Sequence, residues 1–200
     1  MRANGLAPYA LGMTPRPHFF GYGSLVNRST HDFVEAHPAK ARGWRRTWCL
    51  TGHRDHAFLS VVRDVATTIE GLMAHVPGGD WAALDAREAG YARVRACDDV
   101  DHAVADPVEV AIYSVVPGRW PVKERMPILL SYLDVVLQGF LREFGEVGAQ
   151  RFFETTDGWE VGIVNDRAAP LYPRHRVLSA EERDFVDGAI AIRGLRVEAL

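Results

Sequence analysis

Short apolar runs rich in β-branched and aromatic residues dominate the first 116 residues of the chain. The first run, His18 to Tyr22, leads directly into a glycine-rich turn. Such residues fit a pleated, half-buried surface better than a helix, so the runs predict strands. The remaining predicted strands are residues 43–50, 57–63, 67–76, 91–97 and 108–116.

Apolar residues spaced by three and four predict four helices. A short one begins at residue 29 or 30 with Phe33 and Val34 on it, and a second follows Asp80. A long amphipathic helix runs from about Arg125 to Phe144. The last helix begins at Ser179, where the letters SAEE form a capping box. Its predicted buried face consists of Phe185, Ala189 and Ile190.

The strands come mostly before the helices and do not alternate regularly with them. This order predicts an α+β protein with a mixed or antiparallel sheet, closed as a small barrel and flanked by helices. We expect a loose leader over residues 1–17, a main domain over 18–144 and a C-terminal extension over 145–200 that packs on the same domain.

The amino-acid composition fits a globular protein and limits the kinds of molecule that it could bind. Apolar residues make up 48% of the 200 residues, which is enough for a sizeable core. A net charge of −3, without a basic run that contains aromatics, argues against a nucleic-acid surface. Cys49 and Cys97 fit core thiols in a reducing compartment, although a disulfide between them is also compatible with the sequence.

The sequence predicts no membrane segment. Its most apolar helix, ILLSYLDVVLQGFL, contains Asp134 and is too short to span a bilayer. Glycines and prolines interrupt the first 17 residues, which favours a loose leader over a signal peptide. We therefore expect a cytoplasmic protein.

Glu88 stands where the helical pattern calls for an apolar residue. Trp81, Leu84, Glu88 and Tyr91 fall on one face of the helix after Asp80. Burial disfavours the charged form of a carboxylate, so Glu88 is a candidate general base and acid in an apolar pocket. A glutamate at the rim, paired with a nearby arginine such as Arg87, is the alternative.

The turn Gly21-Tyr22-Gly23-Ser24 follows the first strand. Two glycines let consecutive N–H groups point into one concavity, which can bind a carboxylate or a developing oxyanion. We expect a positive φ at Gly23, which a β-branched residue would resist. A plain tight turn is the alternative. The third glycine of a dinucleotide-binding loop is missing, and Ser24 is not part of a G-x-S-x-G motif.

Three further groups have a structural and a functional interpretation. His53 and His56 have the spacing H-x-x-H but lack a third metal ligand, so a loop between strands is favoured. Tyr132 is either a core tyrosine or a phenol that faces a substrate. The polar cluster of residues 165–174 is expected to be a solvated loop, with a segment that covers a substrate as the second interpretation. Its members are Asn165, Asp166, Arg167, Tyr172 and Arg174.

Together these motifs resemble the γ-glutamylcyclotransferase superfamily, including its ChaC-like and AIG2-like branches. The resemblance rests on FGYGSL, RGWRRTW, EGLMAHV, LDAREAGY and YLDVVLQG, and covers roughly residues 18–144. The YGSL turn followed at this distance by an LD-x-x-E helix is the more specific feature. The sequence departs from the pattern at Asn27, at Ile128 and Leu129, and in the short interval from Glu88 to Tyr91.

The resemblance implies a small mixed β-barrel packed with helices, and release of 5-oxoproline from a small γ-glutamyl compound without metal or organic cofactor. It implies that Glu88 moves the protons and that Tyr132 faces the substrate. It also implies that the turn's backbone grips the substrate, a role that maps onto Tyr22, Gly23, Ser24 and Leu25.

Two other functions remain open from the sequence. One is a non-catalytic AIG2-like module that binds a small amide without turning it over. The other is a cyclotransferase that acts on a γ-glutamylamine. The sequence fixes neither the leaving group nor the oligomeric state.

Overall fold

The computed structural model describes residues 14–49, 55–116 and 126–200. The main sheet has seven strands, six of them in the order β4-β6-β1-β3-β2-β5, and β8 pairs with β2. A second sheet has the order β10-β9-β7. The strands are β1 (Arg16–Gly21), β2 (His37–Cys49), β3 (Phe58–His75), β4 (Ala92–Arg95), β5 (Val100–Asp101), β6 (Val108–Ser114), β7 (Ile128–Leu129), β8 (Thr156–Asp157), β9 (Ile163–Asn165) and β10 (Val197–Ala199).

The predicted α+β class with a mixed sheet is confirmed. β1 runs antiparallel to β3 and parallel to β6, and the main sheet curls into a half-barrel. The helices are α1 (Trp81–Arg87), α2 (Leu130–Glu154) and α3 (Ala180–Ile192). Single 3-10 turns occur at η1 (Ser24–Val26), η2 (Arg28–Thr30), η3 (Pro77–Gly79) and η4 (Trp159–Val161).

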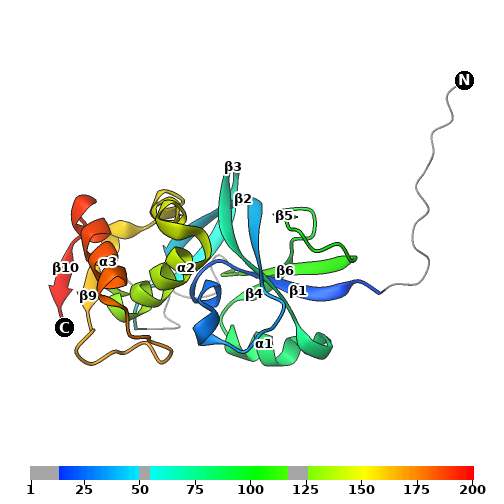
Figure 1. The fold of residues 1–200 in the computed structure, drawn as a ribbon, viewed down its shortest axis with the longest axis horizontal. Helices are drawn as coiled ribbons and strands as arrows, with labels where there is room; N and C mark the ends of the chain where they lie inside the picture. The colour runs from blue at the N-terminus through cyan, green and yellow to red at the C-terminus, as the bar shows by residue number, and fades with distance from the viewer. Residues whose placement is uncertain (1–13, 50–54, 117–125) are drawn as a thin grey trace, which may run out of the picture.

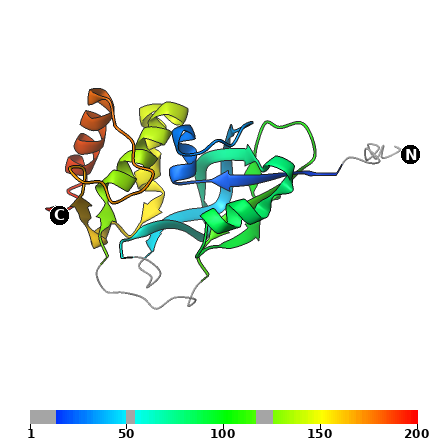
Figure 2. The ribbon, with the colours of Figure 1, turned by 90° about the horizontal axis from the view of Figure 1, so that it is seen from below.

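The helices are distributed unevenly around the sheet. α2 and α3 lie side by side at one end of the molecule, whereas α1 lies below the sheet in the view of Figure 1. Figure 2 shows the same separation from below. α2 packs against η1, which brings the segment after β1 next to this long helix. One apolar core joins residues before and after position 145, for example Leu133, Phe140, Phe152 and Val186.

β3 replaces two of the predicted strands. It runs without interruption from Phe58 to His75, where the sequence predicted separate strands over 57–63 and 67–76. Its pairing with β2 shifts at the predicted gap, because residues 64–67 lie opposite the single Gly43. Gly43 has a φ of +75°, which the absence of a Cβ allows, so the ladder continues past the bulge. Residues 43–49 of the predicted strand 43–50 are likewise only part of the longer β2, and residue 50 lies outside the described residues.

The predicted short helix after residue 29 is wrong. The structure forms only η2, and Val34 is 60% exposed. The side chain of Asn27 accepts a hydrogen bond from Ser29 N at 3.1 Å and so supports one turn. His31, the residue after the last residue of η2, has an extended backbone with a φ of −157°, so the turn ends at Thr30.

The predicted start of the long helix is also wrong. Residues 126 and 127 are not helical and are followed by β7, which pairs with β9, so α2 begins only at Leu130. Pro127 lies before that start, where proline disfavours a helical predecessor. The predicted end at Phe144 coincides with a kink, because Gly145 has a non-helical backbone with a φ of +65°, and a second helical stretch follows to Glu154.

The last helix confirms its predicted start. Ser179 Oγ accepts a hydrogen bond from Glu182 N, and the Glu182 carboxylate accepts one from Ser179 N at 2.9 Å. Ala189 and Ile190 are buried and Phe185 is partly buried, as predicted. Both cysteines are half-buried free thiols. In the described part of the chain, no helix is both long and apolar enough to cross a membrane.

Candidate active site

The YGSL turn requires small residues because its surroundings are crowded. An ideal Cβ placed on Gly21 would lie 2.6 Å from the Cβ of Leu25. One placed on Gly23 would lie 3.0 Å from the hydroxyl oxygen of Tyr132. The expected positive φ at Gly23 is wrong, because its φ is −128°. Close approach of other groups, rather than a left-handed backbone, explains the second glycine.

The helix that carries Glu88 is shorter than predicted. Asp80 caps it by accepting hydrogen bonds from Ala82 N at 3.1 Å and Ala83 N at 3.3 Å. α1 ends at Arg87, and Glu88 is its C-cap residue with φ −94° and ψ 30°. Glu88 and Tyr91 are therefore not on a continuous helical face. The end of the helix, not its apolar stripe, positions the carboxylate.

Glu88 nevertheless lies beside the turn. It lines two neighbouring cavities of about 60 and 40 Å³, and both also include Ser24, Tyr91 and Tyr132. The smaller cavity is lined in addition by Tyr22, Gly23 and Leu25. The Glu88 side chain is 18% exposed. The structure thus brings together all six residues that the sequence singled out: Tyr22, Gly23, Ser24, Leu25, Glu88 and Tyr132.

Glu88 has both a charged and an apolar side: it pairs with Arg87, as in the alternative interpretation, and Phe20 and Leu59 line the smaller cavity with it. Arg87 Nε lies 3.2 Å from Glu88 Oε1. Burial lowers the pKa of Arg87, the Glu88 charge partly offsets that shift, and repulsion from Arg174 adds to it. Two cations therefore accompany one carboxylate at this site, and Arg87 and Arg174 both line the larger of the two cavities.

The phenol of Tyr22 takes a structural role. Its hydroxyl donates a hydrogen bond to Tyr113 O at 2.6 Å, and the side chain is buried. Burial raises the pKa of Tyr22 well above its usual value, and the charge of Glu88 raises it further. The phenol therefore stays protonated at neutral pH, and the backbone of Tyr22 is the part that forms the turn.

Tyr132 lies in the first turn of α2 inside a group of aromatic rings. Its ring meets Trp48 edge-on at 5.8 Å and Tyr172 edge-on at 4.9 Å between centroids. Edge-to-face contacts at these distances are the preferred aromatic geometry. They fix the direction of the Tyr132 ring, and its hydroxyl lies next to Gly23.

The polar cluster of residues 165–174 is only partly solvated: Asn165 is exposed, whereas Asp166 and Tyr172 are buried. Asp166 is 1% exposed and accepts hydrogen bonds from Ser131 N at 2.8 Å, Ser131 Oγ at 2.5 Å and Leu171 N at 2.9 Å. These hydrogen bonds hold the segment against the start of α2. Tyr172 and Arg174 of this segment thereby line the larger of the two cavities that contain Glu88.

An ion pair also holds this segment. Arg167 donates hydrogen bonds to the two carboxylate oxygens of Asp134, at 2.7 and 2.6 Å. Burial pulls the pKa of Arg167 down, but its bonds to Asp134 and Asp187 raise it above its usual value. The sequence offered no signal for this pairing, because 33 residues separate Arg167 from Asp134.

Sequence reasoning missed several residues of the site. His56 was interpreted as part of a loop, yet it lines the cavity with Glu88, as do Phe58 and Arg174. His53, its partner in the H-x-x-H spacing, lies outside the described residues. Within residues 14–49, 55–116 and 126–200, no group of three or more His, Cys, Asp or Glu side chains could hold a metal ion.

The curled mixed sheet and the helices around it have the fold of γ-glutamyl cyclotransferases. A solved structure named gamma-glutamyl cyclotransferase matches 86% of this chain and 98% of its own length, with a TM-score of 0.54 and 11% identity.

Two other solved structures have the same fold. YkqA from Bacillus subtilis matches 72% of this chain, with a TM-score of 0.54 and 18% identity, and the chain spans 57% of its length. The uncharacterized protein loc79017 from Homo sapiens matches 85% of this chain and 97% of its own, with a TM-score of 0.55 and 12% identity. At these identities the likeness establishes the fold alone.

Comparisons of sequence add no nearer relative. No family model matches the chain. No curated protein matches it either.

Proposed function

We propose that the protein is a γ-glutamylcyclotransferase that releases 5-oxoproline from a γ-glutamyl compound. The observation that carries the proposal is that Glu88 lines one cavity with Gly23, Ser24 and Leu25, on a γ-glutamyl cyclotransferase fold. The reaction needs a proton acceptor and an oxyanion site close to each other, and this cavity supplies both kinds of group.

The substrate carries its own nucleophile. Its α-amino nitrogen attacks the γ-carbonyl carbon, a C–N bond closes the five-membered ring, and the bond to the leaving amine breaks. The enzyme has to hold one molecule in the attacking conformation, which is an effect of proximity and orientation. Two protons must move, one from the attacking amine and one to the leaving amine.

We assign both proton transfers to Glu88. The α-ammonium group loses two protons in all. The first passes to solvent and leaves the neutral nucleophile, and Glu88 takes the second as the ring closes and returns it to the departing nitrogen. The N–H groups of Gly23 to Leu25 stabilise the oxyanion of the tetrahedral intermediate, and the Tyr132 hydroxyl orients the glutamyl group.

The two arginines complement the charge of the substrate. Every γ-glutamyl compound with a free α-amino acid end carries an α-carboxylate, and Arg87 and Arg174 line the same cavity as Glu88. A guanidinium can form two parallel hydrogen bonds to a carboxylate. Because the two cavities measure only about 60 and 40 Å³, we expect them to enclose the glutamyl part and leave the departing amine outside.

Glu88→Gln tests the proposal, because glutamine keeps the shape of the side chain and cannot accept a proton. The variant should fold and lose about 10²–10⁴-fold in kcat for 5-oxoproline release. The control is Asp85→Asn. Asp85 lies one turn earlier on α1, where it accepts a hydrogen bond from the Tyr113 hydroxyl, and this variant should retain its activity.

The substrate panel should include γ-glutamyl amino acids, glutathione and γ-glutamylamines, with 5-oxoproline quantified by chromatography. Near-normal turnover by Glu88→Gln would remove Glu88 from the mechanism. Saturable binding of a panel member to the wild-type protein, without 5-oxoproline from any of them, would refute the enzyme and favour a binding module.

A further inference from the structure

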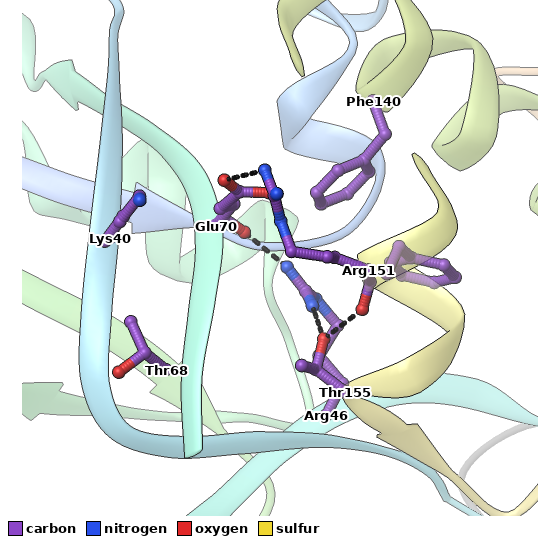
Figure 3. A pocket seen from close by; sticks show the side chains of 8 residues that line it. Lys40, Arg46, Thr68, Glu70, Phe140, Arg151 and Thr155 are labelled. Atoms are coloured by element: carbon purple, nitrogen blue, oxygen red, sulfur yellow. Dashed lines mark hydrogen bonds and ion pairs between the residues drawn. The ribbon is translucent and has the colours of Figure 1, made fainter. Parts of the chain in front are cut away.

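A buried guanidinium lies behind the YGSL turn. Arg46 of β2 is 1% exposed and is among the largest fully buried side chains of the described residues. The rings of Phe140 and Phe152 lie 4.9 and 5.0 Å from its central carbon. Arg46 lines a cavity of about 230 Å³, and Figure 3 shows the side chains around that cavity. Such a charge is costly to bury unless its N–H groups are bonded.

The N–H groups of Arg46 are bonded to oxygens from three separate segments. Nε donates to Tyr22 O at 2.9 Å, and Nη1 donates to Thr155 Oγ1 at 2.7 Å. Nη2 donates to the backbone oxygen of Glu70. Because the guanidinium is planar and rigid, these three acceptors fix its plane. One of them, Tyr22 O, belongs to the turn of the candidate active site.

The bond to Tyr22 O determines where the next N–H points. The Tyr22–Gly23 peptide is trans, since the described residues contain no cis peptide bond. In a planar trans peptide the C=O and the N–H point in opposite directions. With the carbonyl directed at Arg46, the Gly23 N–H is directed away from it. Gly23 itself lines the cavity that Glu88 also lines, and a Cβ placed on it would point at the Tyr132 hydroxyl.

We propose that Arg46 is a positioning residue for the cyclotransferase reaction: it orients the Tyr22–Gly23 peptide so that the Gly23 N–H faces the reacting carbonyl. The inference rests on the proposed function. The positive charge behind the carbonyl also polarises the peptide, which makes its N–H a stronger donor to a developing oxyanion. Burial lowers the pKa of Arg46 to about 9, and the nearby Glu70 and Tyr22 limit that shift, so the side chain is charged at neutral pH.

A single peak can report the orientation of this peptide. Tyr-Gly occurs only once in the sequence, at positions 22 and 23. Labelling tyrosine with carbonyl ¹³C and glycine with ¹⁵N therefore leaves one cross-peak in an HNCO spectrum. Its ¹³C shift reports the hydrogen bond to Tyr22 O, and its amide shifts report the Gly23 N–H.

The test variant is Arg46→Met, which is unbranched, fits between the two phenylalanine rings and has no donor or charge. The matched control is Thr155→Val, which removes another partner of Arg46 and leaves the bond to Tyr22 in place. We expect Arg46→Met to move the cross-peak and to lower kcat about 10²-fold with little change in KM. Thr155→Val should lower the midpoint of thermal unfolding but leave the peak and kcat near wild-type values.

Arg46→Lys replaces Arg46→Met if the latter does not fold. Lysine keeps the charge but has no Nε–H, so the peak should move and kcat should fall in the same direction. The inference is overturned if the peak and kcat stay unchanged, or if Thr155→Val loses as much kcat as the Arg46 variant. If the wild-type protein yields no 5-oxoproline, the proposed function fails, and the cross-peak still decides whether Arg46 orients the peptide.

Discussion

One added methyl group at Gly23 should disturb the candidate site in a way that can be measured. In Gly23→Ala, the new Cβ would lie 3.0 Å from the Tyr132 hydroxyl oxygen and 3.2 Å from Leu59 Cδ2. Both separations are shorter than ordinary contact. Leu59 is 1% exposed and cannot move aside, and the Tyr132 ring is held by two aromatic neighbours. Overpacking of this kind typically costs about 1–3 kcal/mol in the free energy of unfolding.

The Tyr132 hydroxyl is the nearer of the two obstacles, and Tyr132→Phe removes it. If the clash with this hydroxyl supplies about half of the cost, the double variant should recover about 1 kcal/mol relative to the sum of the single variants. Urea denaturation of the four proteins gives this coupling energy, provided that the slope against urea concentration stays constant. Additivity of the two changes within about 0.3–0.5 kcal/mol would refute the close-approach explanation for Gly23.

Two further predictions concern charge. Arg174→Gln should raise KM for γ-glutamyl substrates about tenfold with little change in kcat, because one charge-assisted hydrogen bond to the substrate is lost. An unchanged KM in steady-state assays would exclude a contact between Arg174 and the substrate. Burial lowers the pKa of His18 and of His31 below the ordinary value of 6.5, so the folded protein keeps them neutral while the unfolded chain takes up protons. The free energy of unfolding should therefore decrease as the pH falls below about 6.5, and His18→Gln should make that decrease smaller in urea titrations at several pH values.

Local signals predicted the helix caps correctly. Asp80 and Ser179 bond to N–H groups two or three residues away, so the residues that decide each cap are adjacent in sequence. The sequence signal for the C-terminal end of α1 was weaker. Gly90 lies after it with a φ of +104°, but the chain leaves the helix already at Glu88. The apolar spacing of Trp81, Leu84 and Tyr91 therefore overstated the length of the helix.

The bounds of β2 and β3 depend on pairing between distant residues. β2 begins at His37, although the sequence from His37 to Arg42 lacks a run of strand-forming residues. Those six residues pair with the apolar half of β3 in a regular ladder, from Met73 back to Thr68. A strand can be imposed by its partner, because propensity depends on packing against neighbouring strands. No pattern within residues 37–42 carries that information.

The glycine turn and Glu88 were visible from sequence because each stands in a short motif. Arg174 appeared only in the second interpretation of the cluster 165–174, and Arg46 had no individual role, because their roles depend on contacts across more than 20 residues. Arg46 stands in the RGWRRTW motif, which was interpreted as a strand and as part of the family resemblance. A charged residue in an apolar strand is a signal for a buried role, but the sequence cannot identify its acceptors.

The turn of the candidate site is part of the core rather than a free loop. Asn27, which follows η1, donates hydrogen bonds to Val135 O and to Gln138 Oε1, both at 2.9 Å. Gly139 faces the same segment so closely that a Cβ there would lie 2.7 Å from Asn27 N. Together with Arg46 behind Tyr22, these contacts hold the turn from α2 and from the sheet.

A turn held in this way needs little rearrangement when charge develops next to it. Donors that are already oriented stabilise a transition state more than a ground state, so their contribution belongs to kcat. Arg174 comes instead from a segment that is bonded to the start of α2 through Asp166, and in the proposed mechanism it binds the α-carboxylate, whose charge does not change during ring closure. Its contribution therefore belongs to KM. If variants of Arg46 raised KM and variants of Arg174 lowered kcat, the assignment of kcat effects to the turn and of KM effects to the segment 165–174 would be wrong.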